Sequence, residues 1–276
     1  MITQEKYRTA VKELLASGTV KMVIGYRPGS TSDRRRPLFI RTSEEADQLV
    51  LDSLCVTNLS GYLVTEGLLS DEKQVGIFLR PEGIRSINIL AAESQLNADQ
   101  VVILGFDSTD RVVSPLQGRH ASEFSELIGD SKENPRESPK EPLLERIESM
   151  NAEERFDYWQ EEFSRCIKCY ACRQACPMCY CRRCIVDSNQ PQWINTSSHT
   201  LGNFEWNLVR AFHLAGRCVQ CGNCDRACPV NIPLRLINQR MAKEVMEGFD
   251  HFAGLSQSQE PVLASFKKDD TETFIL

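Results

Sequence analysis

Long apolar runs are absent from this sequence. The 276-residue chain contains no stretch of roughly 18 apolar residues, the minimum for a membrane-spanning helix. Its first residues, MITQEKYRTAVKELLASG, are charged and amphipathic and lack the uninterrupted apolar segment of a secretory signal. We therefore expect a cytoplasmic protein without a transmembrane segment, which associates with membranes only peripherally, through its partners.

The usual signatures of nucleotide binding and of catalysis are also missing. No Walker motif and no Gly-x-Gly-x-x-Gly motif occurs, and no paired carboxylates, Ser/His/Asp set or catalytic Cys/His pair stands out. A turn-rich loop at residues 29–36 could cradle a phosphate, but its spacing favours a solvated loop. The net charge of −6 argues against a nucleic-acid partner. Substrate chemistry is therefore expected on another chain.

Cysteine, in contrast, is abundant, with 12 residues. In the absence of a secretory signal, we expect these cysteines to be metal ligands in a reducing compartment rather than disulfides. Eight of them form two blocks with the spacing C-x2-C-x2-C-x3-C-P, which holds 4Fe-4S clusters. The first block contains Cys166, Cys169, Cys172 and Cys176, and the second contains Cys218, Cys221, Cys224 and Cys228.

The two blocks are predicted to exchange ligands. A 4Fe-4S cluster needs one thiolate per iron, and a short turning loop can supply three of them. In two-cluster ferredoxins the last cysteine of each block binds the other cluster, and the following proline turns the chain away. The predicted ligand sets are therefore Cys166, Cys169, Cys172 and Cys228 for one cluster, and Cys218, Cys221, Cys224 and Cys176 for the other. Structural zinc is the weaker alternative, because zinc sites usually pair C-x-x-C knuckles across a longer loop.

Four cysteines remain: Cys55, Cys179, Cys181 and Cys184. The last three lie in the short run CPMCYCRRC, which could hold three corners of a further cluster, and Cys55 could supply the fourth ligand from the N-terminal domain. A third 4Fe-4S cluster is thus one hypothesis, with zinc or free, partner-directed thiols as alternatives. Cys176 could also join this run, which would break the crossed scheme.

Apolar strands and amphipathic helices alternate in the first part of the chain. We predict strands at residues 19–26, 37–41, 74–80 and 100–106, and helices at residues 3–17 and 81–96, near 42–50 and from about Val56. Such alternation is typical of a parallel sheet covered on both faces. Residues 1–129 are therefore predicted to form an α/β domain with a small, mostly parallel sheet.

The second part of the chain is predicted to be helical. Residues 130–142 have the composition of a solvated linker. In residues 143–250, Phe156, Trp159 and Phe163 form an apolar stripe that leads to the first block, and further amphipathic helices precede and follow the second block. These features predict an all-α dicluster ferredoxin domain, followed by a C-terminal tail at residues 251–276.

The cluster region resembles known families. Residues 166–240, with both blocks and the passage AGRCVQCGNCDRACPVNIPL, are similar to the α-helical ferredoxin domain of heterodisulfide reductase C-type subunits and succinate dehydrogenase iron–sulfur subunits. The run CYACRQACPMCYCRRC and the passages GYRPGS, LCVTNL and VGIFLRPEGIRSI resemble the β-subunit family of anaerobic formate dehydrogenases and deazaflavin-reducing hydrogenases. This second resemblance extends over most of the chain.

The resemblance implies a non-catalytic electron-transfer subunit of a multisubunit oxidoreductase of anaerobic metabolism. Its partners would be flavin- or cluster-containing subunits of a formate dehydrogenase, a hydrogenase or a heterodisulfide-reductase-like complex. Some members of the β-subunit family bind FAD, so one alternative is a flavin-containing reductase subunit with FAD in the N-terminal domain. A second alternative is an iron–sulfur sensor or scaffold.

Overall fold

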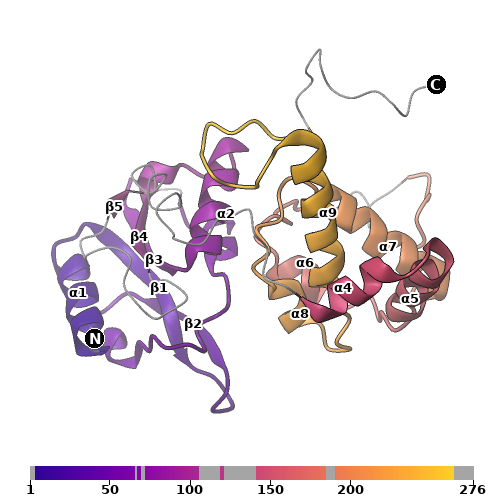
Figure 1. Ribbon diagram of the computed structural model, residues 1–276. Coiled ribbons are helices and arrows are strands. Elements are labelled where there is room, and N and C mark those ends of the chain that lie inside the picture. Colours follow the sequence, from indigo (N-terminus) through magenta and orange to yellow (C-terminus); the bar gives the residue numbers. More distant parts are fainter. Residues whose placement is uncertain are drawn as a thin grey trace. The chain divides into compact units, whose positions relative to one another are not determined.

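The chain forms two compact units in the computed structural model (Figure 1). The structure describes residues 4–65, 67–69, 72–105, 119–120, 141–184 and 190–263. Unit 1 comprises Met1–Glu133 together with Gly254–Gln259, and unit 2 comprises Asn134–Ala253 together with Glu260–Leu276. The predicted linker lies almost wholly outside the described residues, as does the last part of the predicted tail.

Unit 1 is built on a five-stranded sheet in the order β2-β1-β3-β4-β5. Its strands are β1 (Val20–Pro28), β2 (Arg35–Ile40), β3 (Gln74–Leu79), β4 (Val101–Gly105) and β5 (Arg119–His120). The three central strands, β1, β3 and β4, are parallel, as the alternating pattern predicts. The edge strands β2 and β5 run antiparallel to their neighbours, so the sheet is mixed rather than mostly parallel.

The antiparallel edge at β2 follows from the length of its connection. Only residues 29–34 separate β1 from β2, whereas a parallel connection needs a crossover of about a dozen residues or more. The loop that could have cradled a phosphate is this hairpin turn, closed by a hydrogen bond from the Gly29 N–H to the Arg34 carbonyl at 2.9 Å. A Cβ atom on Gly29 would lie 2.8 Å from the same carbonyl oxygen, so the turn requires glycine.

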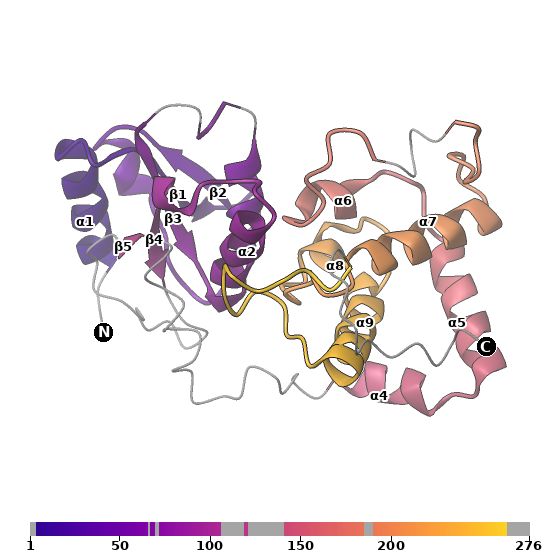
Figure 2. The ribbon, with the colours of Figure 1, turned by 90° about the horizontal axis from the view of Figure 1, so that it is seen from above.

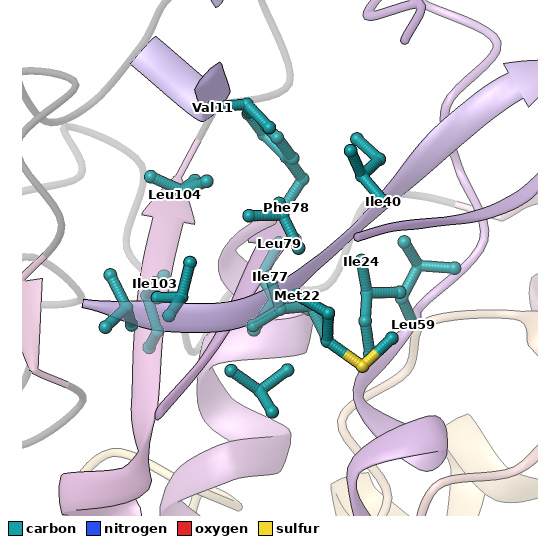
Figure 3. Close-up of a cluster of buried hydrophobic side chains, with 14 of the residues drawn as sticks. Val11, Met22, Ile24, Ile40, Leu59, Ile77, Phe78, Leu79, Ile103 and Leu104 are labelled. Atoms are coloured by element: carbon teal, nitrogen blue, oxygen red, sulfur yellow. The ribbon is translucent and has the colours of Figure 1, made fainter. Parts of the chain in front are cut away.

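One helix covers each face of the sheet. Helix α1 (Gln4–Ala16) packs on β1, and α2 (Pro81–Ala92) packs on β3 and β4. The two helices lie on opposite sides of the strands (Figures 1 and 2). The strand residues Val75, Ile77 and Ile103 are therefore almost fully buried. Figure 3 shows part of the resulting core, in which Val11 of α1 contributes with side chains from four strands and from the Leu59 turn.

Two predicted helices of unit 1 are only short 3-10 turns. They are η1 (Glu45–Gln48) and η2 (Ser60–Val64), and a third turn, η3 (Ala98–Gln100), precedes β4. After η1 the chain becomes extended at Leu49, and the Val50 N–H donates to the Tyr26 carbonyl of β1 at 2.9 Å. This return to the sheet ends the turn before an α-helix can develop.

A segment near the C-terminus belongs to unit 1. The Asn88 side chain of α2 donates from Nδ2 to the Gly254 carbonyl at 2.9 Å, and Leu255 packs against the core. Gly254 has a φ of 80°, and a Cβ atom there would lie 2.4 Å from the Arg85 carbonyl oxygen. Glycine at this position therefore lets the segment lie directly on α2.

Unit 2 is helical in its described residues. Its helices are α4 (Pro142–Ser149), α5 (Ala152–Ser164), α6 (Ala171–Ala175), α7 (Thr200–His213), α8 (Asn223–Ala227) and α9 (Leu234–Phe249). A capping box formed by Asn151 and Glu154 starts α5. Phe163 at the end of α5 is fully buried, stacked on Trp159 and in edge contact with Phe204 of α7. This aromatic contact fixes the point where the chain enters the first cysteine block.

Candidate iron–sulfur site

The two cysteine blocks share left-handed residues at matching positions. In the first block Lys168 and Tyr170 have φ values of 51° and 58°, and in the second Gln220 and Gly222 have φ values of 61° and 71°. Each pair occupies the second and fourth positions after the first cysteine of its block, and each block continues into a five-residue helix, α6 or α8. Successive residues that alternate between right- and left-handed conformations turn their N–H groups toward one point, where they bind anionic groups.

One pocket of unit 2 gathers three cysteines of the first block and the last cysteine of the second. It encloses about 320 Å³ of unfilled space, part of it open to solvent. Its sulfur-bearing residues are Cys166, Cys169, Cys172 and Cys228, and its remaining walls include Trp206, Ile232 and Leu234. Backbone N–H groups already point at two of the sulfurs: Lys168 donates to Cys166 Sγ and Ile232 to Cys228 Sγ, both at 3.4 Å. We call this pocket A.

A second pocket, pocket B, has the reciprocal composition. It encloses about 370 Å³, again partly open to solvent. Its sulfur-bearing residues are Cys176 from the first block and Cys218, Cys221 and Cys224 from the second. Met178, Leu214 and Val219 supply apolar walls. Each pocket thus contains one of the two ligand sets that the spacing predicted, including the exchanged fourth cysteine.

The donor sets fit 4Fe-4S clusters better than single ions. Four thiols surround a hollow in each pocket, as a cluster with one thiolate per iron requires. Within the part of the chain that the structure describes, no three His, Cys, Asp or Glu side chains converge closely enough to bind one metal ion. A tetrahedral zinc site would bring four donors to about 2.3 Å from one centre, which is a different arrangement.

Buried asparagines hold the loops in place. Asn203 of α7 donates from Nδ2 to the Cys166 carbonyl at 2.6 Å, at the start of the first block. Asn223 of α8 donates from Nδ2 to the Ala175 carbonyl at 2.9 Å, next to Cys176. The second contact ties the two blocks together beside the exchanged ligand. Sequence reasoning missed both asparagines, because neither belongs to the cysteine spacing.

Arg210 of α7 is the other residue that the motif does not reveal. It is only 4% exposed, and its Nη2 atom donates to the Cys172 carbonyl at 3.1 Å. Burial by itself lowers the pKa of the guanidinium, but its electrostatic interaction with the thiolate forms of four neighbouring cysteines outweighs burial and raises that pKa; these are Cys179, Cys176, Cys172 and Cys224. The sequence counted this arginine only as part of a basic excess in the cluster region.

The run CPMCYCRRC lies beside these pockets. The Cys179 N–H donates to the Cys176 carbonyl at 3.1 Å, and the contact of its thiol with Cys176, together with burial, raises the pKa of Cys179. Cys181 is exposed, and Cys184 packs against the small core around Ile194 and Trp206.

Cys55 lies in unit 1, in the loop before η2. It is fully buried in the core, its thiol donates to the Val50 carbonyl at 3.4 Å, and burial raises its pKa to about 12. Cys55 therefore belongs to unit 1, whereas the three cysteines of the CPMCYCRRC run belong to unit 2. The predicted third cluster stays a prediction.

Comparison with known proteins identifies the class. Residues 162–232 match the family model described as the 4Fe-4S dicluster domain, which covers both cysteine blocks. Residues 162–232 of this chain therefore resemble a 4Fe-4S dicluster domain. The predicted α-helical cluster region is confirmed at this level.

Two individual relatives give a more specific resemblance. The chain is 30% identical over 124 residues to the F420-dependent formate dehydrogenase subunit beta of Methanocaldococcus jannaschii, which is 44% of this chain and 32% of the relative. It is 31% identical over 105 residues to the F420-dependent formate dehydrogenase 1 subunit beta of Methanococcus maripaludis, which is 38% of this chain and 26% of the relative. The resemblance to β subunits of formate dehydrogenases is thus confirmed, but the matches cover 44% or less of this chain rather than most of it, and a third or less of these relatives.

The described helices contain no candidate membrane span. None of them has the length and apolarity that crossing a bilayer requires.

Proposed function

We propose that this chain relays single electrons between redox partners through two 4Fe-4S clusters. The observation that carries the proposal is the composition of pockets A and B, each of which contains three cysteines of one block and the last cysteine of the other. When bound, the clusters supply reversible one-electron redox chemistry over a wide range of potentials. The chain supplies their ligands, their orientation and their surroundings.

The exchanged ligands support transfer between the two sites. Cys172 and Cys176 belong to the same short segment around α6, and Cys224 and Cys228 to the equivalent segment around α8. The two helices also contact each other. Each five-residue segment therefore connects one pocket to the other, which favours a fixed spacing between two redox centres. A fixed spacing is what an electron relay needs.

The pocket walls favour electron transfer over substrate chemistry. In pocket A the side chains of Trp206, Ile232 and Leu234 are almost fully buried, and in pocket B those of Met178 and Leu214 are. Such walls limit water on the inner side of each pocket, whereas Cys169 of pocket A is exposed. Hydrogen bonds, charge and solvent exposure are what set the potentials of such centres. We therefore place substrate conversion on partner chains.

The partners are proposed from the relatives. Those relatives are β subunits of F420-dependent formate dehydrogenases, and we propose that this chain likewise works inside a multisubunit oxidoreductase. Because it matches only part of their length, the donor and the acceptor are proposed only as a class: flavin- or cluster-containing redox subunits.

The ligand exchange can be tested by comparing serine variants of the anaerobically prepared full-length protein. Cys169→Ser marks the electron paramagnetic resonance (EPR) signal of the pocket A cluster, and Cys221→Ser marks that of the pocket B cluster. We expect Cys176→Ser to alter the signal that Cys221→Ser alters, and Cys228→Ser to alter the signal that Cys169→Ser alters. If Cys176→Ser instead reproduced Cys169→Ser, the exchanged assignment would be wrong.

Iron and flavin analysis of the same protein tests the remaining sites. Two clusters require eight irons per chain, four for each cluster. Twelve irons that fall to eight in Cys55→Ala would support the predicted third cluster, and eight irons in both proteins would contradict it. Flavin released on denaturation would support the FAD alternative for unit 1.

A further inference from the structure

Arg210 lies next to residues of both predicted cluster sites, so its charge can act on both. Its guanidinium donates to the carbonyl of Cys172, a ligand residue of pocket A, and the residue also lines pocket B beside Cys176 and Cys224. Helix α7, which carries it, packs on α5 and α9. The side chain is thus anchored in the helical core rather than on a mobile surface.

Among the residues that the structure describes, no carboxylate forms a hydrogen bond with Arg210. Its Nη2 atom binds a carbonyl, and its Nε atom is buried with no hydrogen-bond partner. Burying an unbalanced charge is costly, so native proteins pair such groups with an opposite charge. The ionisable groups that interact with the guanidinium are the thiols of Cys179, which belongs to neither ligand set, and of Cys176, Cys172 and Cys224. The last three become negative when they bind a cluster.

Arg235 provides a contrast within the same pocket. It also lines pocket B, but its Nη2 atom lies 2.7 Å from a Glu141 carboxylate oxygen, and its Nε atom lies 3.6 Å from an Asp225 carboxylate oxygen. Its charge is therefore balanced by protein carboxylates. Of these two arginines, Arg210 is therefore the one whose positive charge can balance the negative charge of the cluster ligands.

We propose that Arg210 raises the reduction potentials of both clusters by acting as a shared, buried positive charge. This inference rests on the proposed function, since it requires clusters in both pockets. Reduction adds one negative charge to a cluster, and a fixed cation in a poorly screened environment stabilises that charge. Because one guanidinium adjoins both ligand sets, its removal is expected to move both potentials in the same direction.

The test is an EPR-monitored redox titration of Arg210→Met and Arg210→Lys in the full-length protein. We expect Arg210→Met to lower the ratio of reduced to oxidised cluster at a fixed ambient potential by about tenfold at both sites, which is about 59 mV for a one-electron couple. Arg210→Lys keeps the charge and is expected to stay near the wild-type potentials. Iron content is measured on every sample first.

Arg173→Met is the matched control. Arg173 neighbours the ligand Cys172 in sequence, but its guanidinium makes a solvent-exposed hydrogen bond to the Cys181 carbonyl at 3.1 Å. Arg173 is half-buried, so water screens its charge more than it screens the charge of the buried Arg210. Its removal is therefore expected to shift both potentials less than Arg210→Met does. An equal shift in the control would overturn the assignment to Arg210.

The remaining outcomes are also decisive. Iron-loaded Arg210→Met with unchanged potentials, or with only one shifted potential, would overturn the inference while leaving the electron-relay proposal intact. If Arg210→Met failed to retain its clusters, the potentials of Arg210→Lys would test the inference instead. Wild-type potentials in Arg210→Lys would support the proposed effect of the positive charge, and clearly lowered potentials would contradict it. A wild-type protein without iron would instead overturn the proposed function itself.

Discussion

At the scale of single residues, the cysteine spacing predicts which residues are ligands and also which of them share a cluster. The exchanged sets were predicted from the spacing and from the ligand exchange of two-cluster ferredoxins, and the pockets contain the same groupings. Arg210, Asn203 and Asn223 could not be found in this way, because their roles depend on which face of a helix meets a loop far away in the sequence.

Asn223 offers a residue-scale test of the link between the blocks. We expect Asn223→Ala to weaken the pocket B cluster selectively, because the variant loses the hydrogen bond to the Ala175 carbonyl beside Cys176. Leaving a buried carbonyl without its partner costs about 1–3 kcal/mol. The measurement is the rate of cluster loss to an iron chelator, with the EPR signals reporting which cluster is lost first.

The matched control for this variant is Asn238→Ala. Asn238 is also buried and also lines pocket B, but its amide donates only to the Leu234 carbonyl within its own helix. We expect a smaller acceleration of cluster loss. Faster loss of the pocket A cluster in Asn223→Ala would contradict the proposed link.

At the scale of elements, hydrophobic periodicity predicted most helices and strands of the described residues. It failed where the tertiary context decided the outcome. The predicted helices around residues 42–50 and after Val56 are short 3-10 turns. The first of them ends where the Val50 N–H donates to the Tyr26 carbonyl of β1. The antiparallel direction of β2 follows from its short connection to β1, and hydrophobic periodicity does not predict the direction of a strand.

Helix α5 allows an element-scale prediction. The Asn151 side chain accepts a hydrogen bond from the Glu154 N–H at 3.0 Å, and the Glu154 carboxylate accepts one from the Asn151 N–H at 3.0 Å. We expect Asn151→Ala to lower the free energy of unfolding of unit 2 by about 1 kcal/mol, without changing the iron content. Urea denaturation followed by helical circular dichroism measures the change.

The comparison for the capping box is Glu161→Ala. Glu161 is exposed on the same helix and takes no part in the cap, so a change within about 0.5 kcal/mol is expected. An equal loss of stability in both variants would show that the capping box does not control the start of α5.

At the scale of the whole molecule, the chain does not divide into units in simple sequence order. Residues 254–259 belong to unit 1 although the residues on either side belong to unit 2. The sequence did not predict this, because the segment has no periodic apolar pattern. Its attachment depends on one glycine conformation and one asparagine hydrogen bond, neither of which leaves a recognisable sequence signal.

Gly254→Ala tests that attachment. The new Cβ atom would meet the Arg85 carbonyl oxygen at 2.4 Å, and the backbone φ of 80° is unfavourable for alanine. We expect the segment to detach from α2 at a cost of about 2–4 kcal/mol, including the lost hydrogen bond to Asn88. Hydrogen exchange of peptides covering residues 254–259 and α2 is expected to accelerate.

A second glycine variant separates this effect from a general one. Gly248 lies within α9, and a Cβ atom there would meet nothing within 4 Å. Gly248→Ala is expected to stabilise the helix by up to about 1 kcal/mol and to leave exchange at residues 254–259 unchanged. Unchanged exchange in Gly254→Ala would contradict the described packing of the segment.

The most direct test of the account is the iron and acid-labile sulfide content of the anaerobically prepared, full-length protein, measured together with its folded state. The account predicts at least eight irons and eight sulfides per chain, four of each for each cluster, with EPR signals appearing on reduction. A folded protein that contains no iron, or that holds zinc in both pockets, would contradict it.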